Sequence, residues 1–203
     1  VVNRVGPHPY WGGRVQCLHV SVETKRPEMV ALLLDAGAEV DGRNDGNEHW
    51  SPLMLSYWME NAKIRALLLS RGARIGLCEA LLAGDDDQVD TLLAKGEPPI
   101  PEDRPRGLLA LARTPHAVDR LLDLGVSPDE VDRWGADAME ALSRLGPRGR
   151  PLVERLKEEG VRVSAAELAR MGECDALERL YSSRASEVIA EKSPCIFIYR
   201  RDH

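Results

Sequence analysis

The chain has 203 residues, of which 43% are hydrophobic and only 4% aromatic, and its formal net charge at pH 7 is -6. This charge argues against a general nucleic-acid binder, because neutralising phosphates requires a concentrated excess of Lys and Arg. The low aromatic content favours a core of leucine, alanine and valine packed between helices. The longest apolar runs are too short to span a bilayer, so we expect a cytoplasmic protein that does not enter membranes.

Residues 1–15 are rich in glycine and proline between Gly6 and Gly13, and this composition predicts an N-terminal loop rather than a helix. A first unit follows at residues 16–41. It begins with Gln16-Cys17-Leu18-His19 and ends with Leu33-Leu34-Asp35-Ala36-Gly37-Ala38. Residues 39–46 then contain Asn-Asp-Gly, which favours a β-hairpin.

The clearest unit covers residues 51–74. Ser51 is predicted to cap a helix through its hydroxyl, and Pro52 suits the first helical position because it has no N–H to leave unpaired. Gly72 permits the left-handed turn that ends a second helix. The distance from Gln16 to Gly37 (37 − 16 = 21) equals the distance from Ser51 to Gly72 (72 − 51 = 21).

These two units resemble the ankyrin repeat, whose signature places Thr-Pro-Leu-His-x-Ala at the start of a first helix and Leu-Leu-x-x-Gly-Ala at the end of a second. The resemblance extends over about residues 16–184. It implies an all-α solenoid of about six helical hairpins with short β-hairpin fingers on some of them. The expected units are 16–41, 51–74, 75–96, 107–129, 137–162 and 163–184, followed by a C-terminal tail at 185–203.

The later units are less regular. The third and sixth run directly into their first helices and have no finger sequence, and residues 97–106 contain four prolines that exclude a helix. Ser164 and Glu167 have the spacing of a capping box at the start of the sixth unit. Residues 193–201 change character and indicate a short strand or a docked tail.

No catalytic or metal-binding pattern is present in the sequence. The five histidines are not spaced like metal ligands, as they would be in an H-E-x-x-H motif. The sequence also contains no phosphate-binding loop and no motif around a nucleophilic serine. The resemblance implies that His19, the signature histidine, bonds to backbone. Asp85, Asp86 and Asp87 precede a helix, where carboxylates favour the positive end of the helix dipole. The four separated cysteines favour free thiols, and we expect no metal, cofactor or enzymatic activity.

The resemblance implies that a concave face, formed by finger tips and first helices, binds a protein partner. Aromatic side chains lie at such positions, and tryptophan, tyrosine and arginine are enriched at binding hot spots. For Trp50, packing and partner contact are equally supported, whereas Trp134 has the spacing of a packing residue. The predicted binding residues of this monomer are Tyr10, Trp11, Arg43, Asn47, His49, Trp50, Trp58 and Met59.

Two alternatives remain at this stage. A small-ligand or enzymatic module would place its site near Tyr10, Trp11, His49 and Trp50. A purely connective role, as the helical segment of a longer polypeptide, is compatible with a chain that begins at Val1 and ends in a tail of different composition.

Overall fold

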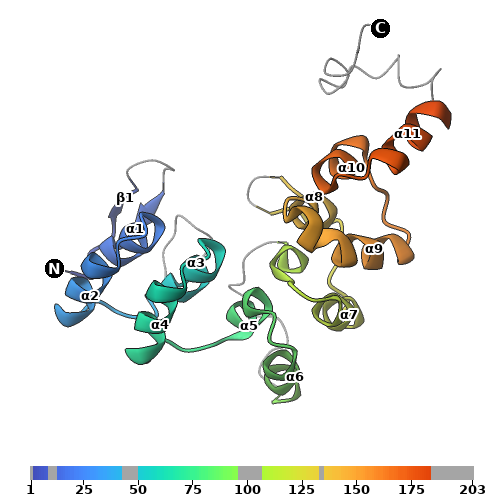
Figure 1. The fold of residues 1–203 in the computed structure, drawn as a ribbon. Coiled ribbons are helices and arrows are strands. Elements are labelled where there is room, and N and C mark those ends of the chain that lie inside the picture. The colour runs from blue at the N-terminus through green and yellow to red at the C-terminus, as the bar shows by residue number, and fades with distance from the viewer. Residues whose placement is uncertain (1, 9–12, 43–49, 96–106, 133–134, 184–203) are drawn as a thin grey trace, which may run out of the picture. The chain divides into compact units, whose positions relative to one another are not determined.

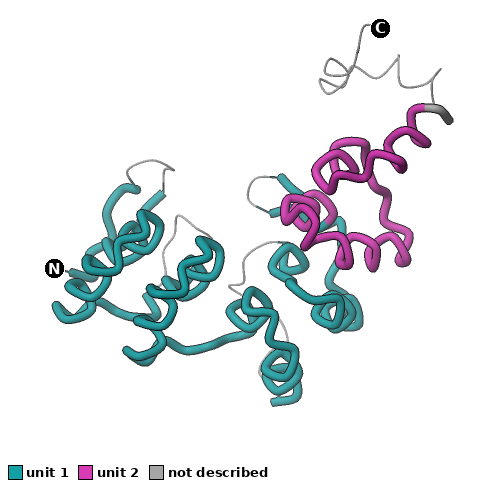
Figure 2. Tube along the Cα trace, viewed as in Figure 1, with its two compact units in different colours: residues 1–138 teal, residues 139–203 magenta. Residues whose placement is uncertain are grey.

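The computed structural model describes residues 2–8, 13–42, 50–95, 107–132 and 135–183. The chain forms two compact units, residues 1–138 and residues 139–203, which Figure 2 shows in different colours. The predicted all-α fold is confirmed, because almost all regular structure in the described ranges is helical. None of the helices in these ranges is long and apolar enough to cross a membrane.

Unit 1 contains two short strands and a series of helical hairpins, labelled in Figure 1. Its elements in chain order are β1 (Gly6–Pro7), β2 (Arg14–Val15), α1 (Cys17–Glu23), α2 (Pro27–Asp35), α3 (Pro52–Trp58), α4 (Ala62–Ser70), α5 (Leu77–Ala83), α6 (Asp86–Ala94), the 3₁₀ helix η1 (Leu108–Leu111) and α7 (Pro115–Asp123).

Each hairpin of unit 1 packs on the next. The first helices α1, α3 and α5 pack in sequence, and α5 also packs against η1. Among the second helices, α2 packs on α4 and α6 on α7. The core lies between them and is aliphatic; its largest fully buried side chains are Leu18, Leu53, Ile64, Leu68, Leu81, Leu108, Leu109 and Leu121. The repeats therefore bury one another's apolar faces, as a repeat architecture requires.

Ser51 links two successive hairpins. Its Oγ accepts a hydrogen bond from the Met54 N–H at 3.0 Å, so the predicted cap of α3 is confirmed. The same hydroxyl donates to Glu79 Oε1 at 2.6 Å, and Glu79 Oε2 accepts from the Gly76 N–H at the start of α5. Both Ser51 and Glu79 are buried. The start of α3 is thereby joined to the start of α5.

The glycines that close the first two units adopt the predicted left-handed conformation. Gly37 has φ 85° and Gly72 has φ 86°. In both turns the N–H of the following alanine donates to the carbonyl of a leucine in the preceding helix, Leu33 or Leu68. A side chain at either glycine would be strained by the backbone alone.

Two segments differ from the sequence-based expectation. The N-terminal loop contains a small antiparallel pairing, with Gly6 opposite Val15. The first helix of the fourth unit is only the short η1. Its length is limited because Gly107 before it is left-handed and Thr114, which precedes Pro115, is extended; a residue before proline disfavours the helical region.

The fingers and the tail are mostly outside the described residues. This applies to 43–49, 133–134 and the tail 185–203. At the base of the fourth unit's finger, the Asp132 N–H donates to Ala136 O at 2.8 Å and the Ala136 N–H donates to Asp132 Oδ1 at 2.9 Å. The fingers themselves stay predictions.

Unit 2 contains the helices of the fifth and sixth predicted repeats. They are α8 (Ala138–Ser143), η2 (Gly146–Gly149), α9 (Arg150–Glu158), α10 (Ala165–Met171) and α11 (Cys174–Ser183). Gly149 lies so close to Leu142 O that a Cβ atom there would clash with it. The predicted capping box is confirmed, since Ser164 Oγ accepts from the Glu167 N–H and the Glu167 carboxylate accepts from the Ser164 N–H.

The adjacent leucines of α4 test the packing. Leu68 is fully buried and Leu69 is 37% exposed. Leu68→Ala should lower the free energy of unfolding by roughly 2–5 kcal/mol, because it removes core contacts and leaves a cavity. Leu69→Ala should cost much less in the same urea titration. Equal costs for the two variants would contradict the helix register described here.

The link through Ser51 makes a second prediction. Ser51→Ala should lower the free energy of unfolding by about 1–3 kcal/mol, since it removes a helix cap and a hydrogen bond to the buried Glu79 carboxylate. Ser70→Ala is the matched control, because the Ser70 hydroxyl is exposed and bonds only to Leu67 O in its own helix. Comparable losses in both variants would show that Ser51 does not couple the hairpins.

Candidate functional site

Two tryptophans at the second predicted repeat, which belongs to unit 1, differ in exposure. Trp50, just before α3, is only 7% exposed, whereas Trp58, the last residue of α3, is 44% exposed. Their rings meet edge to face, with centroids 5.3 Å apart and an interplanar angle of 84°. This arrangement is a favoured one for aromatic pairs. Trp50 therefore supports the ring that Trp58 presents to solvent.

Arg113, from the segment between η1 and α7, contacts the same Trp58 ring. Its Cζ lies 5.8 Å from the ring centroid, within the range of cation–π attraction. One guanidinium nitrogen, Nη1, donates to Ala110 O at 3.0 Å and to Ala112 O at 2.7 Å. Burial lowers the pKa of Arg113 to about 10, while the negative charge of Glu60 opposes this shift. Arg113 remains a cation at neutral pH.

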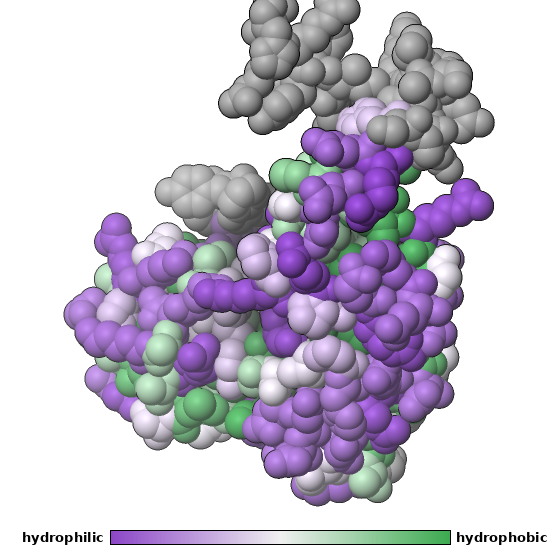
Figure 3. Space-filling view, turned by 45° about the vertical axis from the view of Figure 1, so that its right-hand side comes forward, coloured by the Kyte–Doolittle hydropathy of each residue, from purple (hydrophilic) through white to green (hydrophobic). Residues whose placement is uncertain are grey.

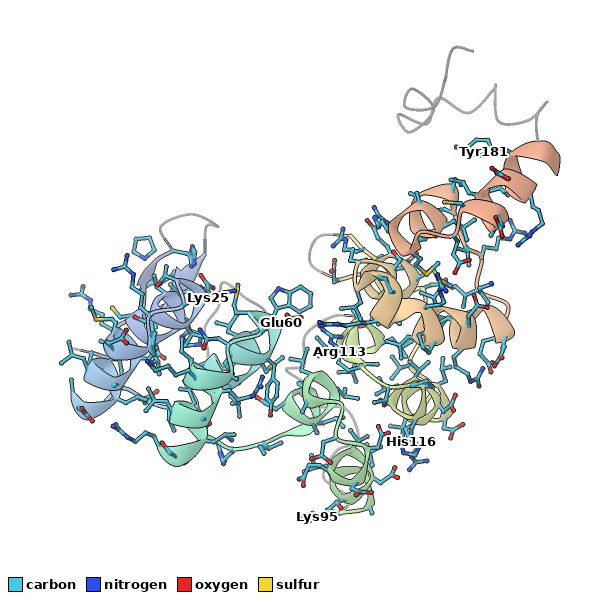
Figure 4. The ribbon with its side chains drawn as sticks, viewed as in Figure 1. Lys25, Glu60, Lys95, Arg113, His116 and Tyr181 are labelled. Carbon is cyan, nitrogen blue, oxygen red and sulfur yellow. The ribbon has the colours of Figure 1, made fainter. Side chains whose placement is uncertain are left out.

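The turn after α3 carries the other members of the site. Met59 caps the helix by donating its N–H to Leu55 O at 2.8 Å and is half-buried. Glu60 is exposed and has φ 51°, a left-handed conformation that is uncommon outside glycine. Figure 4 shows Glu60 and Arg113 on neighbouring segments of the face that carries the end of α3. We call Trp50, Trp58, Met59, Glu60 and Arg113 the Trp58 site.

His19 positions Trp50 from the preceding repeat. It is fully buried, and its Nε2 lies 3.1 Å from Trp50 O, so it donates to that carbonyl. The predicted backbone role of His19 is therefore confirmed. Burial lowers the pKa of His19 to about 4, although the bond to the Trp50 carbonyl acts in the opposite direction. The imidazole is neutral at pH 7 and serves as a donor.

Of the residues predicted to bind a partner, three are in the described ranges: Trp50, Trp58 and Met59. They lie together at the Trp58 site. The other predicted residues lie outside the described ranges: Tyr10, Trp11, Arg43, Asn47 and His49. Sequence reasoning missed Glu60 and Arg113, because no local pattern indicates that a residue before Thr114 reaches the end of α3.

Trp58 also stands out among exposed apolar residues. Figure 3 shows a face on which hydrophilic residues dominate and hydrophobic ones form small patches. The exposed large hydrophobic residues of the described ranges are Met29, Leu32, Trp58, Leu69, Ile75 and Val131. Trp58 is the aromatic member of this set and lies on a first helix, whereas Met29, Leu32 and Leu69 lie on second helices.

Asp85 and Asp90 have structural roles. Asp85 caps α6 by accepting from the Gln88 N–H at 3.0 Å, as its place before the helix predicted. Asp90 on α6 accepts from Arg120 at 2.8 Å and from His116 at 3.0 Å on α7, which joins two repeats at the surface. Within the described ranges, no group of three or more His, Cys, Asp or Glu side chains is arranged to hold a metal ion.

Comparison with known proteins identifies the repeat type. The family model described as ankyrin repeat matches residues 16–45. Among solved structures, the human ASB11 ankyrin repeat domain is 24% identical, with a TM-score of 0.37, over 81% of this chain and 75% of that chain. No curated protein matches this chain.

The buried His19 predicts a pH dependence of stability. Its pKa in the folded protein, about 4, lies below the ordinary histidine pKa of 6.5. Between these two pH values His19 is protonated in the unfolded chain and neutral in the folded protein. Stability should therefore be full above about pH 7 and should fall by about 3 kcal/mol as the pH is lowered to about 4.

Urea titrations between these pH values measure the effect. His19→Gln should be less stable at pH 7, since it disturbs the bond to Trp50 O, and its stability should change less with pH than that of the wild type. Parallel pH profiles for the two proteins would mean that His19 is not held neutral.

Proposed function

This chain is an ankyrin-repeat protein, and we propose that it is a scaffold that binds a protein partner on the face formed by its fingers and the ends of its first helices. Ankyrin repeats are generally protein-interaction modules, and the fold is typically non-enzymatic. Fold alone does not define a function, so the proposal rests on the Trp58 site.

The observation that carries the proposal is a large aromatic ring that is exposed yet held on two sides. Trp58 is 44% exposed, with Trp50 against it at 5.3 Å and Arg113 at 5.8 Å. A ring held in this way loses little conformational freedom when a partner covers it. Tryptophan and arginine are also the residue types most enriched at binding hot spots.

The proposed surface consists of the residues that the sequence predicts to bind a partner, and each described residue among them has a distinct role. Trp58 and Met59 offer apolar contact, and Trp50 packs against the Trp58 ring. Glu60 and Arg113 add charged groups beside them, and protein interfaces combine an apolar centre with a polar rim. We include in this surface the other predicted residues, Tyr10, Trp11, Arg43, Asn47 and His49. We also propose that the protein is a monomer located in the cytoplasm. The free cysteines of the described ranges favour a reducing compartment.

Trp58→Ala tests this proposal. It should weaken partner binding by about 2 kcal/mol or more, with little loss of stability because the side chain is already partly exposed. The partner is first isolated by affinity capture from the native lysate and identified, and the purified pair is then measured by isothermal titration calorimetry. Trp50→Ala should reduce both stability and binding, since Trp50 is buried and supports the Trp58 ring.

Leu32→Ala is the matched control for this experiment. Leu32 is 60% exposed and lies on the second helix α2, away from the proposed face. Its removal should leave affinity unchanged. If Trp58→Ala also leaves affinity unchanged in a fully folded protein, the partner binds elsewhere.

A further inference from the structure

We propose that Arg113 receives a carboxylate of the partner, so that the protein recognises a segment in which an acidic side chain neighbours an apolar one. The acidic side chain would pair with the Arg113 guanidinium, and the apolar one would lie on Trp58. This inference rests on the proposed function, because it names the chemistry of the partner at the Trp58 site.

The guanidinium of Arg113 is held in position before any partner arrives. Nη1 donates to Ala110 O and Ala112 O, and Cζ lies 5.8 Å from the centroid of the Trp58 ring. An arginine has five N–H donors, and the two carbonyls engage only those of Nη1. The residue is partly exposed, and the proposal assigns its remaining donors to the partner's carboxylate.

Among the described residues, Arg113 has no carboxylate at ion-pair distance, whereas about half of the other arginines there do. Elsewhere, Arg71 pairs with Asp35, Arg120 with Asp90 and Arg150 with Glu173, at 2.7 to 2.8 Å. Around Arg113, the described residues supply two neutral carbonyls and the charge of Glu60 at longer range. A half-buried cation without a close counter-charge is costly, and an incoming carboxylate would offset this cost.

The surroundings favour a carboxylate over a phosphate group. A guanidinium can bind a carboxylate through two parallel hydrogen bonds. The negative charge of Glu60 acts on Arg113 at longer range, and this charge repels a phosphate, which carries nearly two charges at pH 7, more strongly than a carboxylate. Trp58 provides apolar surface next to the guanidinium, which suits an acidic residue with an apolar neighbour in a peptide.

A displayed library of random peptides, selected against the full chain, tests this inference. Selected peptides should be enriched in Asp or Glu next to an apolar residue. One synthesised peptide is then titrated by calorimetry. Arg113→Gln should weaken its binding about tenfold or more, because it removes one partner of a half-buried charge pair. Arg113→Lys should weaken it less. Glu60→Gln should strengthen binding, since it removes the competing negative charge.

Arg65→Gln is the matched control, because the Arg65 guanidinium lies over another aromatic ring, that of Tyr57, at 4.6 Å from its centroid. It should leave peptide affinity unchanged. If Arg113→Gln does not fold, two measurements on folded protein decide instead: the Glu60→Gln titration, and the wild type with a peptide whose acidic residue is replaced by its amide.

The outcomes separate this inference from the proposed function. Peptides that need Trp58 but show no acidic enrichment and bind Arg113→Gln normally would overturn the inference and leave the proposed function intact. If the selected peptides bind Trp58→Ala and Arg113→Gln as tightly as the wild type, or if no peptide is selected, the inference and the proposed function are both overturned. The inference and the proposed function are both supported if acidic peptides are enriched and bind through Trp58. Their affinity should then fall in Arg113→Gln and rise in Glu60→Gln.

Discussion

A hairpin of two short helices cannot bury its own apolar face, and the structure depends on this constraint. The α-helices of unit 1 have seven or nine residues, and isolated helices shorter than about 12 residues are marginal in water. Their stability must come from neighbours. Accordingly, the fully buried leucines and isoleucine lie where one hairpin packs on the next, as with Leu53 of α3 between α1 and α5.

Apolar packing alone would let neighbouring hairpins slide, and buried polar contacts fix their register. His19 reaches the Trp50 carbonyl of the following repeat, and Ser51 reaches Glu79 of the one after that. Thr114 makes a similar but only partly buried contact: its hydroxyl caps α7 and donates to Asp86 of the preceding repeat. Buried polar groups are costly unless they are paired. A shift in register would break these pairs, so one arrangement is selected.

The Trp58 site is a consequence of that register. Its members come from the residue before α3, the end of α3, the turn after it and the segment before α7, which the repeat arrangement brings together. His19 holds the Trp50 backbone, Trp50 supports Trp58, and Arg113 contacts the same ring. The described members of the proposed surface are therefore held by contacts between repeats, which favours the precise placement of groups that bind a partner.

The sequence by itself indicated the repeat type, the helix starts at Ser51 and Ser164 and the closing turns at Gly37 and Gly72, and the family resemblance implied the backbone contact of His19. These features depend on local chemistry, such as a hydroxyl cap or the conformational freedom of glycine, which neighbouring residues reveal. The tertiary structure alone decided that Trp50 is buried and Trp58 exposed, that the fourth unit begins with a short 3₁₀ helix, and that Arg113 contacts Trp58. Exposure and contacts between distant residues depend on how repeats pack, and no local pattern records that packing.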